Sequence, residues 1–142
     1  MSAVVVDSSV AVKWFVPEVL SEQAAHLLDG SFELLTPDLL FPEFGNILWK
    51  KITRGEIQPR EARDVLAALG RVPLVVVSSS GLIEAALEIA IAHQRTVYDG
   101  LYVAVAVAHD CALVTADDRL ARTLAKGPLA RHVRGLSGLV SP

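Results

Sequence analysis

Residues 3–15 read AVVVDSSVAVKWF, and this stretch decides the predicted fold. Three consecutive valines are typical of a strand in the interior of a sheet, where both faces of the sheet are covered. The strand ends on Asp7, and two serines and a helix-like stretch follow it. The residues alone leave two roles open for Asp7. It can cap the following helix, or it can contribute to an acidic site at the carboxyl edge of a sheet.

The length and composition predict one globular domain over residues 1–142. The chain has 142 residues, of which 52% are hydrophobic, and a net charge of −3. This composition argues against disorder, and the charge argues against a protein that binds nucleic acid through bulk electrostatics. The longest apolar run is shorter than the roughly 20 residues of a membrane helix, and the first residues lack the pattern of a signal peptide. We therefore expect a cytoplasmic protein without a membrane partner, in which Cys111 is a buried, inert thiol.

Strand and helix patterns alternate along the rest of the chain. Strands are predicted at residues 3–6, 32–36, 73–80, 112–117 and, weakly, 132–136. Helices are predicted within 8–30, with an interruption near Pro17, and at 42–55, 58–70, 81–94 and 118–127. Residues 97–109 alternate as a strand would, but Thr96 and Asp99 offer helix caps and the alanines favour a helix, which we predict. This alternation implies a mainly parallel sheet with helices on both faces.

Four acidic residues fall where such a sheet would gather them. Asp7 and Asp117 follow strands, whereas Glu43 and Asp99 lie in the first turns of helices. Strand ends and the starts of the following helices meet at one edge of a parallel sheet, where such folds bind ligands. Carboxylates that converge repel one another, so Asp99→Asn is expected to raise the melting temperature of the metal-free protein. Such a site needs a cation, and oxygen ligands favour Mg²⁺ or Mn²⁺.

Each acid also has a purely structural interpretation. Asp7 and Asp117 can cap the helices that follow them. Asp99 can complement a cap at Thr96, and Glu43 can be an ordinary glutamate at a helix N-terminus. For any one of these residues taken alone, the structural interpretation is the more frequent one. Only their common position at one edge of the sheet favours a metal site.

Four segments together resemble the PIN-domain family, and within it the VapC-type toxins of toxin–antitoxin pairs. They read VVVDSSVAVKWFVPE (4–18), PEFGNILWKK (42–51), TVYDGLYVAVA (96–106) and LVTADDRL (113–120). The segments occur in the order and spacing of the family and extend over nearly the whole chain. The resemblance implies a PIN-like α/β/α sandwich with a central, mainly parallel sheet of about five strands flanked by helices. It also supports the helix at 97–109.

The resemblance implies a function and a set of site residues. It implies a Mg²⁺-dependent endoribonuclease that hydrolyses RNA phosphodiester bonds with metal-activated water, with Mn²⁺ as a substitute ion. It also implies a cognate small antitoxin protein and a homodimer. The implied catalytic and metal-binding residues are Asp7, Glu43, Asp99 and Asp117. The implied auxiliary polar residues are Ser9, Asn46, Thr115 and Asp118, the last of which can share or supplement the role of Asp117.

Two other functions were weighed against this one. A phosphoaspartyl enzyme of the haloacid-dehalogenase type needs a second aspartate where this chain has Ser9, and a receiver domain needs an acidic pair and a late lysine that the sequence does not show. A PIN-like module without catalysis, which only binds RNA or a partner protein, stays open as the alternative. An intact set of four acids argues against it.

The remaining polar and aromatic residues carry weaker signals. The basic residues near the acids are solvated charges or RNA contacts, and these are Lys50, Lys51, Arg54, Arg95 and Arg119. The histidines show no metal-ligand spacing, and surface or helix-end positions are expected for His26, His93, His109 and His132. Core or interface packing is expected for Trp14 and Trp49.

Overall fold

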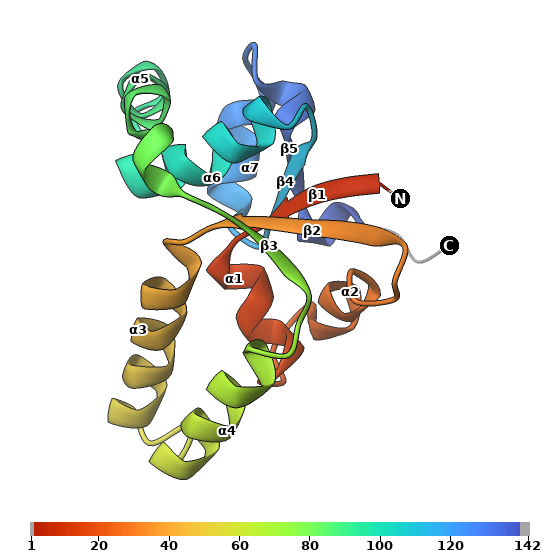
Figure 1. The fold of residues 1–142 in the computed structure, drawn as a ribbon, viewed down its shortest axis with the longest axis vertical. Coiled ribbons are helices and arrows are strands. Elements are labelled where there is room, and N and C mark those ends of the chain that lie inside the picture. Colours follow the sequence, from red (N-terminus) through yellow and green to blue (C-terminus); the bar gives the residue numbers. More distant parts are fainter. Residues whose placement is uncertain (1, 140–142) are drawn as a thin grey trace.

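A computed structural model describes residues 2–139 of the chain. Its five strands form one sheet in the order β3-β2-β1-β4-β5, and every neighbouring pair is parallel (Figure 1). The strands are β1 (Ser2–Val6), β2 (Phe32–Pro37), β3 (Leu74–Val77), β4 (Ala112–Thr115) and β5 (Val133–Gly135). The predicted α/β class and its mainly parallel sheet of about five strands are confirmed.

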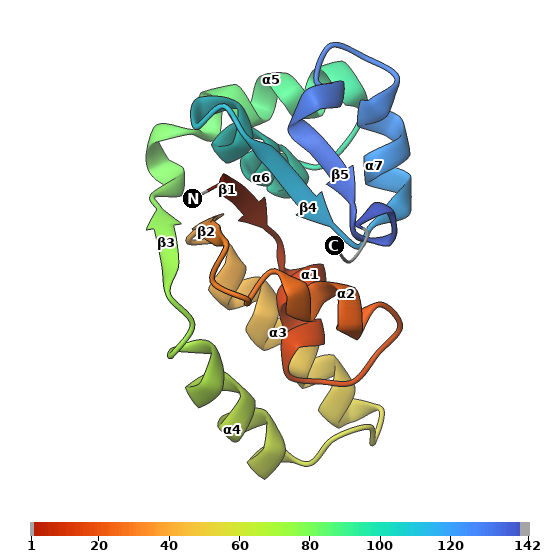
Figure 2. The same cartoon turned by 90° about the vertical axis from the view of Figure 1, so that its right-hand side faces the viewer.

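Helices follow the strands as the sequence predicts. Within residues 2–139 they are α1 (Ser8–Ala11), α2 (Ser21–His26), α3 (Leu40–Thr53), α4 (Pro59–Leu69), α5 (Ile83–His93), α6 (Val97–Ala108) and α7 (Asp118–Ala125). The ambiguous segment is helix α6, so the prediction for it is confirmed. Helices α3 and α4 extend together away from the sheet (Figure 1), whereas α6 and α7 pack against the strands and α5 packs on α6 (Figure 2). None of these helices combines the length and apolar character needed to cross a membrane.

The valine run of β1 is buried on both faces of the sheet. Val5 lies in the core cluster that contains Val103 of α6. Val4 and Val6 point to the opposite face and lie in a second cluster with Ala24 of α2. Because helices cover both faces, the strand needs no polar alternation, which explains its three consecutive valines.

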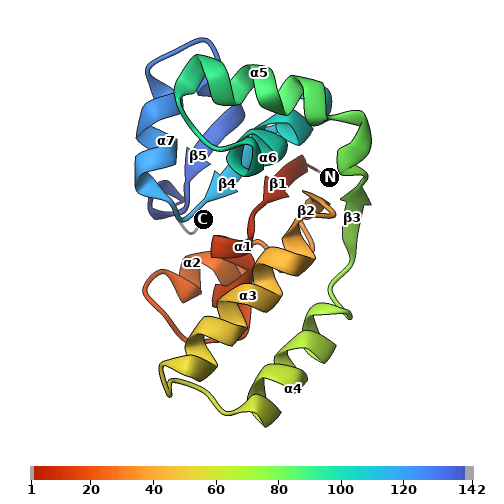
Figure 3. The same ribbon diagram turned by 90° about the vertical axis from the view of Figure 1, so that its left-hand side faces the viewer.

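Gly100 allows helix α6 to approach helix α5 closely. A Cβ atom at Gly100 would lie 2.4 Å from the backbone oxygen of Ala86, which is fully buried in α5. Figure 3 shows α5 lying across α6 at this point. The glycine therefore fixes the position of the first turn of α6, which carries Asp99.

The strand order creates a switch point between β1 and β4. From β1 the chain passes to β2 and β3 on one side, and then returns to β4 on the other side of β1. Ligands of open α/β sheets bind beyond the carboxyl ends of the strands at such a point. Asp7 follows β1 and Asp117 lies shortly after β4, so the topology alone directs two of the four acids to this place.

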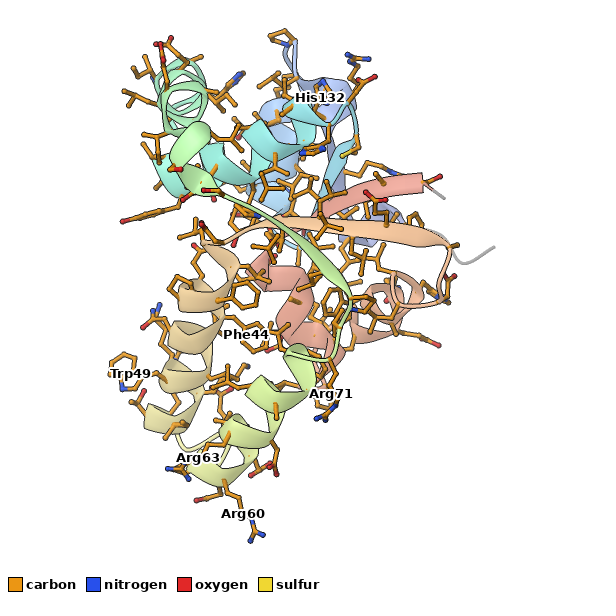
Figure 4. All side chains as sticks on the ribbon, in the orientation of Figure 1. Phe44, Trp49, Arg60, Arg63, Arg71 and His132 are labelled. Atoms are coloured by element: carbon orange, nitrogen blue, oxygen red, sulfur yellow. The ribbon has the colours of Figure 1, made fainter. Side chains whose placement is uncertain are left out.

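Four side chains show where the sequence-based expectations for other residues hold and fail. His132 ends a short 3₁₀ helix as expected, but it is buried, and its Nδ1 atom lies 2.8 Å from the backbone oxygen of Cys111. The Cys111 thiol is only partly buried, although burial still raises its pKa. Trp14 packs against the core, whereas Trp49 is 59% exposed and points away from α3 (Figure 4).

Candidate functional site

The pairing of β1 with β4 brings Asp7 and Thr115 together. Val6 of β1 is in register with Val114 of β4, so the residues that follow these two are neighbours. The Thr115 hydroxyl donates a hydrogen bond to Asp7 Oδ2 at 2.5 Å. The Ser9 hydroxyl donates to the other oxygen, Oδ1, also at 2.5 Å.

Both hydroxyls connect Asp7 to the backbone that leads to Asp117. The Thr115 hydroxyl accepts a hydrogen bond from the Asp117 N–H at 3.1 Å. The Ser9 hydroxyl accepts one from the Ala116 N–H, also at 3.1 Å. Ser9 and Thr115, named as auxiliary residues from the sequence, therefore fix the loop after β4 relative to the end of β1.

Asp7 is a buried carboxylate, with a relative exposure of 7%. Burial raises its pKa to about 6, and the negative charge of Glu43 adds to this effect. The hydrogen bonds from Ser9, Thr115 and the Val10 N–H oppose it but do not offset it. No cationic side chain of residues 2–139 forms an ion pair with Asp7. A cation placed beside Asp7 would favour its ionised form.

Glu43 is held by two hydroxyl groups that the sequence analysis missed. The Tyr102 hydroxyl donates to Glu43 Oε1 at 2.6 Å, and the Ser8 hydroxyl donates to the same oxygen at 3.3 Å. Burial of Tyr102 and its bond to Glu43 raise the Tyr102 pKa, so the phenol keeps its proton. A sequence signal exists for Tyr102, because it lies three residues after Asp99 and so shares a helix face with it.

Asp99 and Asp117 meet at the side chain of Arg95. The Arg95 Nε atom lies 3.0 Å from Asp99 Oδ2, and its Nη2 atom lies 3.0 Å from Asp117 Oδ2. The other Asp117 oxygen, Oδ1, accepts a hydrogen bond from the Leu120 N–H and caps α7. From the sequence, Arg95 was expected to be a solvated charge or an RNA contact, although its spacing of four residues from Asp99 suits an ion pair within one turn.

The other two auxiliary residues lie further from this network. Asn46 lines a small hollow with Glu43 and Tyr98. Asp118 Oδ1 accepts a long hydrogen bond, 3.4 Å, from the Ser137 hydroxyl. The structure thus places Asp118 against the segment after β5 rather than with the other acids.

The side chains present fit a hard divalent cation only in part. The donors are carboxylate and hydroxyl oxygens, which such ions prefer, and Asp7 is a buried acid that lacks a positive partner. As the side chains stand, however, no three acidic, histidine or cysteine groups among residues 2–139 are grouped closely enough to hold an ion. Asp99 and Asp117 direct their Oδ2 atoms to Arg95 instead.

A basic hollow of about 390 Å³ adjoins the acids. Ser9 and Asp117 line its acidic end, and its basic lining consists of Lys13, Lys50, Lys51 and Arg54. Glu18 forms ion pairs with Lys51 and Lys13, at 2.5 and 3.2 Å. Burial of Glu18 would raise its pKa, but the two ammonium groups hold that pKa below its usual value. The single Glu18 carboxylate therefore offsets one of the two positive charges on Lys13 and Lys51. Lys50, in the last turn of α3, and Arg54, directly after the helix, are exposed.

Comparison with known proteins identifies the family. The PIN domain family matches residues 4–126. This chain belongs to the PIN-domain family. It is 39% identical to Ribonuclease VapC3 of Pyrobaculum aerophilum over 119 residues, which cover 82% of this PIN-domain chain and 91% of the relative.

Two solved structures resemble this PIN domain over most of its length. One is the protein PAE2754 from Pyrobaculum aerophilum, with a TM-score of 0.61 and 26% identity, covering 97% of this chain and 86% of the other. The second is a toxin–antitoxin complex from Klebsiella pneumoniae, with a TM-score of 0.58 and 16% identity, covering 94% and 97% of the two chains. The second likeness shows the shared fold alone.

The raised pKa of Asp7 predicts how the stability of the metal-free protein depends on pH. Between pH 3.8 and about 6, the native Asp7 holds a proton that the unfolded chain has lost. Raising the pH through this window should therefore lower the free energy of unfolding, by about 1.4 kcal/mol for each unit that separates the two pKa values. Asp7→Asn should lack this loss. Denaturant unfolding of both proteins in chelator, at several pH values, measures the difference, and a pH-independent difference would contradict the raised pKa.

Proposed function

We propose that this PIN-domain protein is a Mg²⁺-dependent endoribonuclease and the toxin of a toxin–antitoxin pair, with Mn²⁺ as a substitute ion. The observation that carries the proposal is Asp7, a buried acid at the switch point of the sheet that has no cationic partner in the part of the chain the structure describes. Nothing in the fold needs such a group, because an asparagine or serine could cap α1 without the cost of burying a charge. The 39% identity to a protein named as a ribonuclease supports the same activity.

The residues that would hold the ion are Asp7, Glu43, Asp99 and Asp117. When bound, a divalent ion neutralises charge on a phosphate and lowers the pKa of a water molecule, which phosphodiester hydrolysis requires. The chain orients its ligands through neutral donors. Ser9 and Thr115 fix both oxygens of Asp7, and Tyr102 fixes one oxygen of Glu43. The second Glu43 oxygen accepts no hydrogen bond from the described residues, so it is available to orient the attacking water.

Substitution of the acids tests the chemistry. Purified protein should cleave RNA in Mg²⁺ or Mn²⁺ and lose this activity in chelator. Asp7→Asn and Asp99→Asn should each lower the rate by orders of magnitude, because each removes a charge from the proposed ion site, while circular dichroism shows a folded protein. Asp118→Asn is the matched control and should retain most of the activity, since Asp118 faces Ser137. Full activity in chelator, or in both active-site variants, would exclude the metal nuclease and leave the non-catalytic binding module.

The basic hollow suggests where the RNA backbone lies beside the acids. Lys50 and Arg54 are exposed and line the hollow that Asp117 also lines. Phosphates on one side of the scissile bond can therefore contact these two cations while the bond itself lies at the acids. Lys13 and Lys51 are already paired with Glu18 and contribute less positive charge.

The salt dependence of RNA binding tests this path. In an Asp7→Asn background, which leaves RNA intact, Lys50→Ala and Arg54→Ala should each weaken binding. Each should also lower the slope of log K against log salt by about 0.7, the value for one lost phosphate contact on a single strand. Lys126→Ala, at the far end of α7, is the control with the same charge change. Fluorescence anisotropy at several salt concentrations gives the slopes, and equal slopes for all three variants would contradict the path.

The proposal includes an antitoxin, a small protein that binds near the site and suppresses cleavage. The name of the toxin–antitoxin complex with the same fold suggests such a partner, and the partly exposed carboxylates of Glu43, Asp99 and Asp117 offer it a place for a basic side chain. A short reading frame directly upstream of this gene would encode the candidate. Its purified product should form a stable complex with this chain and abolish RNA cleavage, and a product that leaves cleavage unchanged is not the antitoxin.

The proposal also includes a homodimer. Large exposed apolar side chains recur every four residues along α5, at Ile83, Leu87 and Ile91, which are 46%, 46% and 67% exposed. A stripe of this kind on a surface helix usually marks a partner surface, and a two-fold axis would pair it with its own copy. Light scattering at micromolar concentration should show a dimer. Ile91→Lys should shift the dimer to a monomer. Val19→Lys, at an exposed apolar residue outside α5, should leave the dimer intact. A monomeric wild-type protein would contradict the dimer.

A further inference from the structure

Arg95 places a positive charge among the proposed metal ligands. Its guanidinium group donates to Asp99 Oδ2 and to Asp117 Oδ2, at 3.0 Å each, and so bridges helix α6 and the start of helix α7. The Arg95 side chain is 17% exposed, less than either carboxylate. Among residues 2–139, no other cationic side chain forms an ion pair with the four acids.

We infer that Arg95 is an internal counter-ion that competes with the divalent ion for Asp99 and Asp117. The inference rests on the proposed function, because it assigns both aspartates to the ion site. Asp117 Oδ1 caps α7, so Oδ2 is the oxygen that Asp117 can offer to a metal ion. Arg95 already binds this Oδ2 atom. A metal ion that takes Asp117 Oδ2 must therefore displace one arm of the guanidinium.

The backbone at Arg95 is anchored, so displacement requires only a side-chain movement. The Arg95 N–H donates to the Ala90 oxygen at 3.2 Å. Gln94 before it has the left-handed conformation that ends α5, with φ 54°. The long arginine side chain can leave the carboxylates while the loop stays in place. The competition then changes metal affinity without changing the fold.

Arg95 could instead be a fixed clamp that holds the two aspartates in position for the ion. The two roles predict opposite results when the charge is removed. A clamp orients the ligands, so its loss would weaken metal binding. A competitor occupies the ligands, so its loss strengthens metal binding while the metal-free protein loses an ion pair. The sign of the change in metal affinity therefore separates the two roles.

Calorimetric titration of the protein with Mn²⁺ alone, at constant ionic strength, measures this sign. Arg95→Gln should bind Mn²⁺ about tenfold more tightly than the wild type, the change expected when a coupling of ordinary size is lost. Arg119→Gln is the matched control, because Arg119 lines a surface hollow together with Arg95 and Asp99, whereas the ion pairs of Asp99 and Asp117 within residues 2–139 are with Arg95. It should change the affinity by much less, and this difference separates direct competition from the general effect of a nearby charge.

Thermal melting supplies a second measurement on the same proteins. In chelator, Arg95→Gln should melt below the wild type, because Asp99 and Asp117 have lost their shared partner. Adding Mn²⁺ should raise the melting temperature of Arg95→Gln by more than it raises that of the wild type, since stabilisation by a ligand grows as its Kd falls. If Arg95→Gln does not fold, Arg95→Lys takes its place. Its single ammonium group cannot engage both oxygens in the same fork, so it too should bind Mn²⁺ more tightly than the wild type.

The outcomes distinguish this inference from the proposed function. Equal or weaker Mn²⁺ binding by the Arg95 variants, with normal binding and RNA cleavage by the wild type, overturns the competition and leaves the nuclease intact. Absence of Mn²⁺ binding in the wild type and in every variant overturns the metal nuclease itself, and the competition with it. Tighter binding by Arg95→Gln and not by Arg119→Gln supports both.

Discussion

The hydrogen bond between the Thr115 hydroxyl and Asp7 Oδ2 joins residues that are 108 positions apart in the chain, and the site depends on it. It can form only because β1 and β4 pair in parallel with Val6 opposite Val114. A shift of one residue in this register would turn Thr115 to the other face of the sheet. The buried apolar residues of both strands fix the register, since the same shift would expose them. Core packing therefore determines where the acids lie.

Helix capping and participation in a site are usually weighed as alternatives, and here the same carboxylates do both. One oxygen of Asp7 accepts the Val10 N–H and the other accepts the Thr115 hydroxyl. Asp117 divides its oxygens in the same way, between the Leu120 N–H and Arg95. In each case the cap fixes the side-chain rotamer and leaves the second oxygen directed into the site. The start of a helix thus helps to orient an acid at a strand end.

Patterns within short segments predicted the elements of the fold, because valine runs, proline, glycine and helix caps act over a few residues. They also placed Asp7 and Asp117, since both follow strands directly. The partners of the acids were harder to predict. Tyr102 and Glu43 are 59 positions apart in the chain, and no local pattern reports the hydrogen bond between them. His132 is likewise buried beside a residue distant in the chain, because its ring nitrogen contacts the backbone oxygen of Cys111. Arg95 had a local signal, its spacing from Asp99, but the second contact to Asp117 comes from the tertiary fold.

Four acids at one edge imply mutual repulsion, and the structure distributes that cost unevenly. Asp99 and Asp117 share the charge of Arg95, so the expectation that Asp99→Asn would stabilise the metal-free protein loses its premise at this residue. Asp7 has no such partner within the described residues and is the most buried of the four acids, with its pKa raised chiefly by burial and further by Glu43. Its hydrogen-bond donors, Ser9, Thr115 and the Val10 N–H, are all neutral and do not offset the cost of burying its charge. The buried charge of Asp7 thus lacks a cationic partner among residues 2–139, whereas Arg95 offsets the repulsion between Asp99 and Asp117.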